Sequence, residues 1–329
     1  MRALLVHNPA AGGGRSARLL EPVLERLGRG GFQVEQHRSV SLEDASLAAR
    51  QAASLVDVVV AMGGDGTVGS CAAGLAAAGL AARSNFAAGD TAAHAGYRAV
   101  PLAALGVIPA GGGNDGARNL GLPHDDPLAA ATMLSGLAAR PADLVRAGER
   151  YLLNAGGAGF DAEVSRRANL RLAKAPGQSR YVGAVLAELA IGRPRNFRLD
   201  LDGRTITTSA WMVSVANSQS YGGGMRIAPE ALLDDGLLDV MVVDGALSKP
   251  GFLATFPKVF SGRHVENPLV RLHRAARATL EADEPVAVHF DGEPGGTVPV
   301  TFEVVPAALA VLATEDAPAF SRRPSSSAP

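Results

Sequence analysis

The sequence predicts an α/β domain built on a doubly wound parallel sheet, followed by an antiparallel β-sandwich-like domain, with the active site in the cleft between them. Up to about Pro141, short apolar runs alternate with glycine loops and helical patterns. Beyond it, short strand-like runs are separated by glycine, aspartate and proline. The length of 329 residues also exceeds the need of one ordinary α/β domain. We assign residues 1–141 to the first domain, 142–314 to the second and 315–329 to a disordered tail.

In the first domain, continuous apolar runs predict buried strands, and apolar positions three and four residues apart predict helices. The expected strands are 2–7, 32–36, 57–62 and 104–109, and the expected helices are 16–27, 42–53 and 72–80. Residues 83–98 are small and polar, and we expect a mobile surface loop there. Because strand, loop and helix repeat in this order, the strands should be parallel and carry helices on both faces.

The second domain should be mostly antiparallel, since its apolar runs are short and separated by turn residues. The expected strands are 143–145, 151–154, 197–201, 205–208, 211–216, 238–243, 278–281, 286–290 and 300–304. Two helices, over 181–191 and 250–260, are expected to interrupt them.

Composition excludes several classes of protein. A net charge of -1 and 5% aromatic residues argue against nucleic acid as a partner. Cys71 is the single cysteine, so an internal disulfide and a cysteine-based zinc site are excluded. The first residues do not resemble a signal peptide, and the apolar runs are too short to span a membrane. We therefore expect a cytoplasmic protein.

Lysine is rare, and this excludes two further classes. The chain holds three lysines, Lys174, Lys249 and Lys258, and none precedes residue 174. A P-loop NTPase needs a lysine in its phosphate loop, and a protein kinase needs one on a strand. Any nucleotide must therefore be bound by other groups.

Three glycine loops are expected to bind phosphate instead. They follow the strands 2–7, 57–62 and 104–109, so they should emerge at the same carboxyl edge of the sheet. Backbone amides of such loops bind anions without lysine. Asp65 lies in the second loop, where a carboxylate beside phosphate needs a cation or a hydroxyl between the two charges. A plain helix cap is the alternative for Asp65.

Six motifs in a fixed order carry a family resemblance. Gly63-Gly64-Asp65-Gly66-Thr67 is preceded by Asn8-Pro9-x-x-Gly12 and followed by Pro109-Ala110-Gly111-x-x-Asn114-Asp115. Further on come a Gly-Phe-Asp segment in 154–164, an Asp-Gly-Leu-Leu-Asp segment in 217–240, and Asp291-Gly292-Glu293-Pro294. Together, over roughly residues 1–310, they resemble the diacylglycerol kinase catalytic-domain family of bacterial lipid kinases, related to sphingosine and ceramide kinases. The resemblance implies a nucleotide-binding α/β domain followed by a β-rich domain for lipid and metal.

The resemblance also implies a role for individual residues. The implied nucleotide contacts are Asn8, Pro9, Gly12, Ser39, Gly63, Gly64, Asp65, Gly66, Thr67, Val68, Gly111, Gly112, Asn114 and Asp115. Asp65 and Glu293 are the implied catalytic carboxylates, with Glu293 as the general base toward the acceptor hydroxyl. Asp235, with the carbonyls of Leu232 and Leu237, matches a Mg²⁺ site. The alternatives are a plain Asp-Gly turn at 234–236 and a surface glutamate at 293.

Two positions depart from the family pattern. Gly69-Ser70 stand where the family usually has Asn-Glu, and Gly112 stands where it usually has threonine. Backbone amides are kept at both places, so phosphate binding is still expected with fewer side-chain contacts.

The resemblance implies a kinase that uses ATP and Mg²⁺ to phosphorylate a lipid hydroxyl, most simply that of diacylglycerol to give phosphatidate. The alternatives are an NAD kinase-like enzyme, and a weakly active or inactive relative that binds nucleotide and lipid.

The expected partner is a lipid substrate at a membrane surface. Residues 163–210 hold nine basic and four acidic side chains, so peripheral contact with an anionic membrane at its inner face is expected. An ordinary solvated helix face is the alternative. The oligomeric state stays open, with a homodimer allowed.

Overall fold

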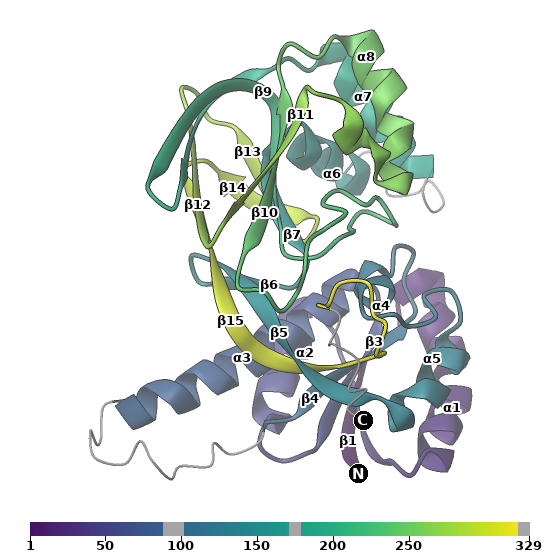
Figure 1. Cartoon of the computed structure of the whole chain (residues 1–329). Helices are drawn as coiled ribbons and strands as arrows, with labels where there is room; N and C mark the ends of the chain where they lie inside the picture. Colours follow the sequence, from purple (N-terminus) through teal and green to yellow (C-terminus); the bar gives the residue numbers. More distant parts are fainter. Residues whose placement is uncertain (88–101, 171–178, 322–329) are drawn as a thin grey trace, which may run out of the picture.

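The computed structural model describes residues 1–87, 102–170 and 179–321. They form two units joined by long strands (Figure 1). In the first unit, most helices lie around a parallel sheet. In the second unit, the helices lie at one side of a twisted antiparallel sheet. This confirms the predicted fold class. Among the described residues, no helix is both long and apolar enough to cross a membrane.

Four parallel strands form the sheet of the first unit, in the order β2, β1, β3, β4. Their bounds are β1 (Arg2–His7), β2 (Gln33–Arg38), β3 (Val58–Gly63) and β4 (Ala104–Pro109). The helices around it are α1 (Ala11–Arg29), α2 (Leu42–Ala52), α3 (Asp65–Ala87), α4 (Asp115–Asn119) and α5 (Pro127–Met133). Every residue of β3 and β4 is buried, because helices cover both faces of these central strands.

Helix α3 differs most from its predicted bounds. It begins at Asp65, directly after β3, and ends at Ala87, whereas the pattern predicted 72–80. Glycines and small residues hide this start in the sequence, since they give no apolar periodicity. Their small size lets α3 pack closely: a Cβ at Gly74 would lie 2.1 Å from the backbone oxygen of Ser46 in α2. The predicted loop over 83–98 is therefore helical to residue 87, and its remainder lies outside the described residues.

The second unit is built from antiparallel strands. Its strands are β6 (Arg150–Leu152), β7 (Ala155–Gly159), β8 (Arg195–Leu201), β9 (Arg204–Ala216), β10 (Leu238–Asp244), β11 (Val270–Ala275), β12 (Arg277–Ala282), β13 (Ala287–Phe290) and β14 (Glu293–Thr297). Its helices are α6 (Phe160–Leu170), α7 (Ser179–Ile191) and α8 (Lys249–Thr255), and the 3₁₀ turns η2 (Phe256–Ser261) and η3 (Arg263–Glu266) follow α8. The runs predicted at 205–208 and 211–216 form the single strand β9.

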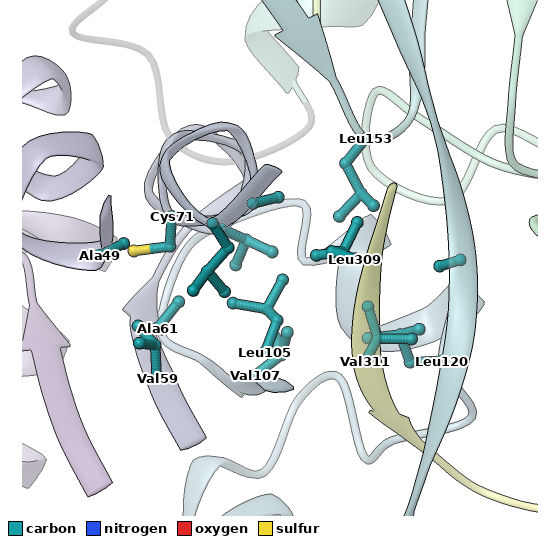
Figure 2. Packing of buried hydrophobic residues seen from close by; sticks show 14 of the residues in the cluster. Ala49, Val59, Ala61, Cys71, Leu105, Val107, Leu120, Leu153, Leu309 and Val311 are labelled. Carbon is teal, nitrogen blue, oxygen red and sulfur yellow. The ribbon is translucent and has the colours of Figure 1, made fainter. Parts of the chain in front are cut away.

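Two long strands belong to both units, so the chain does not divide at one point near residue 141. β5 (Ala138–Ala147) follows the 3₁₀ turn η1 (Leu134–Gly136), and β15 (Val300–Ala313) pairs antiparallel with it. β15 also pairs with β12 in the second unit and, in parallel, with β4 in the first. Figure 2 shows Leu309 and Val311 packed among the buried side chains of the first unit, together with Leu105 and Cys71.

Residues 315–321 contradict the predicted disorder of the C-terminal tail. The guanidinium of Arg140 donates to the carbonyls of Thr314, Glu315 and Ser321 at 3.4, 3.2 and 3.1 Å. It also lies 4.1 Å from the centre of the Phe320 ring. The ring is 4% exposed, so this segment packs because Arg140 binds carbonyls and an aromatic face that composition does not reveal. Residues 322–329 lie outside the described residues.

Phe320→Ala is expected to lower the free energy of unfolding by about 3 kcal/mol, because it empties a buried aromatic site and removes the contact with Arg140. Urea unfolding followed by circular dichroism measures the change. Asp316→Ala, at an exposed position of the same segment, is the control and should be neutral. A loss below about 1 kcal/mol for Phe320→Ala would contradict the packed arrangement.

Candidate active site

A cavity of about 520 Å³ is lined by residues of both units. The glycine loops supply Gly12, Gly64, Asp65, Gly66, Gly112 and Asp115, all of them predicted nucleotide contacts. The second unit supplies Asn154, Asp161, Tyr221, Asp291 and Glu293, together with a wall of apolar side chains. The cavity thus has a polar side at the carboxyl edge of the parallel sheet and an apolar side in the second unit.

The three glycine loops are in direct contact, which only glycine allows. A Cβ at Gly111 would lie 2.4 Å from the Cα of Gly64, and a Cβ at Gly12 would lie 2.2 Å from the carbonyl oxygen of Ala110. Gly12 also has φ of 60°, in the left-handed region. The first turn of α1 is therefore not helical, and Gly12 and Gly13 line the cavity. Backbone amides gathered in this way suit an anion such as phosphate.

The remaining predicted nucleotide residues lie in or beside the same loops but do not line the cavity. They are Asn8, Pro9, Ser39, Gly63, Thr67, Val68, Gly111 and Asn114. Several shape the loops through hydrogen bonds. The Oδ1 atoms of Asn8 and Asn114 accept from the amides of Ala10 and Gly111 at 3.0 and 2.9 Å, and the Ser39 hydroxyl donates to the His7 carbonyl at 3.1 Å.

Gly112 and Gly111 give a sharp contrast for mutagenesis. A Cβ at Gly112 meets nothing within 4 Å. Gly112→Thr is therefore expected to fold normally and to tighten nucleotide binding about fivefold, because one hydroxyl is added to the phosphate loop. Gly111→Ala should abolish binding, since its Cβ collides with Gly64. Calorimetric titration with a nucleotide triphosphate measures both. Equal affinities of the two variants would contradict the loop geometry.

Burial raises the pKa of three of the carboxylates that line the cavity. Removal from water, followed by the charges of Asp115 and Asp291, raises the pKa of Asp65 to about 7, although Gly116 donates its amide to Asp65 at 2.9 Å. Burial likewise raises the pKa of Asp115 and of Asp291. Three acidic groups in one partly dry cavity repel each other, so the site favours a cation between them and a bound anion.

Asp115 also joins the two units. Its carboxylate accepts from the amides of Gly223 and Gly224 in the second unit, at 2.6 and 2.7 Å. The loop around residue 223 is thereby held over the glycine loops of the first unit, which closes one side of the cavity.

Asp291 and Glu293 come from a tight hairpin turn between β13 and β14. Asp291 and Gly292 have φ of 48° and 85°, as a type I′ turn requires. The Asp291 carboxylate accepts from the amides of residues 153, 154 and 155 at 3.0, 3.1 and 2.9 Å, which fixes the turn against the start of β7. Glu293 is exposed at the cavity. Glu293 is thus a surface glutamate beside a turn, which was the alternative to a catalytic role. It is also a side chain that a ligand in the cavity can reach.

The predicted Mg²⁺ site at Asp235 lies away from the cavity. The Asp235 carboxylate pairs with Arg274, and it accepts from the amide of Leu237 at 3.0 Å. In this structure the Asp235 carboxylate is therefore engaged by Arg274 and by the amide of Leu237, and the Mg²⁺ site that the resemblance implies for Leu232, Asp235 and Leu237 stays a prediction. Within the described parts of the chain, no three histidine, cysteine, aspartate or glutamate side chains are placed to hold a metal ion.

The sequence did not single out Asp161, Tyr221 and His289. The Asp161 carboxylate accepts from His289 Nε2 at 2.9 Å and from the Tyr221 hydroxyl at 3.2 Å. Asp161 and His289 stand in or next to recognised motifs, Gly-Phe-Asp and Asp-Gly-Glu-Pro, and this was the signal available for them. Their meeting depends on the pairing of β7 with β13, which the sequence does not reveal.

The apolar side of the cavity is formed by α6, α7, β9, β10, α8 and η2. Its lining residues include Phe160, Val164, Val185, Met212, Met241, Val243, Leu247, Phe252, Phe256 and Val259. An apolar surface of this kind, continuous with an anion site, suits an amphiphile with a polar head.

Comparisons with known proteins agree with this geometry. The diacylglycerol kinase catalytic domain matches residues 2–147, and the YegS C-terminal NAD kinase beta sandwich-like domain matches residues 155–313. A diacylglycerol kinase from Mycobacterium tuberculosis is 35% identical over 93% of both chains. The chain belongs to the diacylglycerol kinase family. It is therefore an enzyme, a kinase that transfers a phosphoryl group.

More distant relatives of this diacylglycerol kinase family member are also known. The diacylglycerol kinase of Bacillus subtilis is 29% identical over 92% of both chains. The crystal structure of a candidate diacylglycerol kinase from Bacillus anthracis gives a TM-score of 0.76 at 25% identity, covering 96% of each chain. Another structure from that organism, of a diacylglycerol kinase, gives a TM-score of 0.70 at 22% identity and covers 96% of this chain and 98% of that one, which supports the fold.

Proposed function

We propose that this kinase transfers the γ-phosphate of ATP to the hydroxyl of a membrane lipid, most simply diacylglycerol, giving phosphatidate. The observation that carries the proposal is one cavity with glycine amides and carboxylates on one side and an apolar wall on the other. A phosphate donor and an apolar acceptor can meet there. The relatives named diacylglycerol kinase support the same acceptor.

The residues of the cavity suit phosphoryl transfer. Glycine amides from the three loops would bind and orient the phosphates, and Glu293 would accept the proton of the acceptor hydroxyl as it attacks. Asp65 is the carboxylate that fits Mg²⁺ beside the phosphates, because burial and the nearby charges of Asp115 and Asp291 disfavour its ionised form without a cation. When bound, Mg²⁺ neutralises phosphate charge, and its usual ligands are one or two carboxylates with phosphate oxygens and water. Asp65 would hold it together with phosphate oxygens, and the cation would supply the positive charge that lysine gives in other phosphate sites, since no lysine is present in the first unit.

Transfer of labelled phosphate tests the proposal directly. The purified protein is incubated with labelled ATP and Mg²⁺, and diacylglycerol, a long-chain base, ceramide and NAD are offered in parallel. Labelled phosphatidate is the expected product. Labelling of NAD alone would contradict a lipid acceptor, and no transfer despite nucleotide binding would indicate an inactive relative. Omission of Mg²⁺ should remove the signal.

Contact with a membrane surface is a further part of the proposal. Within 163–210, several basic side chains are paired with acids: Arg166 with Glu163, Arg167 with Glu188, and Arg193 and Arg195 with Glu284. Residues 171–178 of the predicted basic segment lie outside the described residues. Because these ion pairs offset part of its basic charge, the segment 163–210 supports membrane contact less strongly than its sequence predicts.

Exposed apolar side chains on the helices of the cavity wall support the contact better. Leu186, Ile191, Leu253 and Phe260 are 53, 70, 45 and 43% exposed. They lie on α7, α8 and η2, which also line the apolar side of the cavity, so a lipid leaving a bilayer would enter beside them. Co-sedimentation with lipid vesicles tests this contact. The protein should pellet together with the vesicles, and the bound fraction should increase with the content of anionic lipid.

A further inference from the structure

His289 is almost completely buried, 1% exposed, two residues before the Asp291-Gly292 turn. Its Nδ1 atom lies 3.4 Å from the amide nitrogen of Gly292, which donates to it. Because Nδ1 accepts, the ring proton is on Nε2, and Nε2 donates to Asp161 at 2.9 Å. The imidazole thus links the turn that carries Glu293 to the beginning of α6.

Asp161 is a fixed anchor for this ring. Its Oδ2 atom accepts from both His289 and Tyr221, and its Oδ1 atom accepts from the amide of Ala162 at 2.9 Å. Removal from water and the charge of Asp161 raise the pKa of Tyr221, so its hydroxyl stays protonated and donates. Ser214 lies 2.8 Å from the same hydroxyl.

Glycine in β7 makes room for this arrangement. Gly157 is the cross-strand partner of His289, and a Cβ there would lie 2.7 Å from the Asp161 carboxylate. The groups that face His289 are Asp161 on α6, Tyr221 in the loop after β9, and Asp291 in the turn itself. Each comes from a different element, so the turn is fixed from outside the hairpin as well as by its own strand pairing.

We propose that His289 is a positioning residue for Glu293: anchored by Asp161, it holds the amide of Gly292 and so directs the Glu293 carboxylate into the cavity. The proposal rests on the proposed function, because it assigns Glu293 the proton of the acceptor hydroxyl. A base displaced by about 1 Å loses on the order of 100-fold in rate without loss of substrate binding. His289 does not itself line the cavity.

Two variants separate the two hydrogen bonds of the ring. His289→Asn places an oxygen near the position of Nδ1, so it can keep the contact with Gly292 and lose that with Asp161. His289→Gln places an amide nitrogen near the position of Nε2, so it can keep Asp161 and lose Gly292. His289→Ala removes both, and His273→Ala on β11 is the control outside the cavity.

Steady-state kinetics with the preferred acceptor then decide. For His289→Ala and His289→Gln, kcat should fall about 30- to 100-fold with KM values unchanged, and His289→Asn should recover about tenfold of that loss. In a Glu293→Gln background, His289→Ala should cause no further loss, because the residue it positions is gone. Equal losses in the Asn and Gln variants, or an additive loss in the double variant, would overturn the proposal.

Hydrogen exchange gives a second result that does not depend on activity. Amides of residues 289–297 should exchange faster in His289→Ala than in the unmodified protein, whereas those of β10 should not change. Unchanged protection of 289–297 would overturn the positioning role. If the unmodified protein phosphorylates no lipid, the proposed function fails, and this measurement still decides whether His289 holds the turn.

Discussion

Glu293→Gln is expected to lower the rate of phosphate transfer by about 10²- to 10⁴-fold, the usual contribution of a general base. The amide cannot accept the proton of the acceptor hydroxyl, but it keeps the shape of the side chain. Glu293 is exposed at the cavity and is not needed to hold its turn, which Asp291 fixes through three amides. Nucleotide affinity should therefore stay the same.

Kinetics with saturating lipid, together with calorimetric titration of nucleotide, measure the two effects separately. Glu281→Gln on β12 changes a glutamate that does not line the cavity and should leave both unchanged. If Glu293→Gln keeps more than about a tenth of the rate, Glu293 is not the base.

Asp65→Asn is expected to abolish activity and, at the same time, to stabilise the free protein at alkaline pH. The pKa of Asp65 is raised to about 7 by burial and by its acidic neighbours, whereas an aspartate in the unfolded chain has a pKa of about 3.9. The native state therefore binds this proton more tightly than the unfolded state. Stability from this group is complete below about pH 4 and is lost as the pH rises through 7.

The neutral amide that replaces the Asp65 carboxylate does not titrate, so the variant should escape that loss. Thermal unfolding across pH 5–8 without nucleotide measures the difference in free energy of unfolding between the variant and the unmodified protein. This difference should grow toward pH 8 to on the order of 2 kcal/mol. Mg²⁺ bound with nucleotide should stabilise the unmodified protein more than the variant, since the cation neutralises the Asp65 carboxylate. Asp125→Asn, at an exposed position, is the control. Parallel pH curves for Asp65→Asn and the unmodified protein would refute the assignment.

The parts of the site that could be predicted are local in sequence. The glycine loops follow their strands directly, and parallel pairing brings all strand ends to one edge. The order of elements therefore predicts that Gly12, Gly64, Asp65 and Gly112 lie together, and all four line the cavity. The beginning of α3 at Asp65 was missed, because its small residues give no apolar periodicity.

The parts that could not be predicted depend on long-range pairing. Asp161 and His289 are separated by 128 residues and meet because β7 pairs with β13. The packing of Phe320 on Arg140 likewise joins residues that are 180 positions apart in the sequence. Composition suggested disorder for that segment, but its tertiary contacts, among them those with Arg140, Asp234 and Leu233, show that it folds.

The shared strand β15 affects how this protein is made on the ribosome. The first sheet ends at β4 until residues near Val311 arrive, about 200 residues later in synthesis. At ordinary translation speed this delay is about 10 to 40 s. During it, the nascent first unit presents an unpaired strand edge and the apolar side chains that Leu309 and Val311 later cover. A product that terminates before β15 is therefore expected to aggregate rather than to fold into a half-sized nucleotide domain.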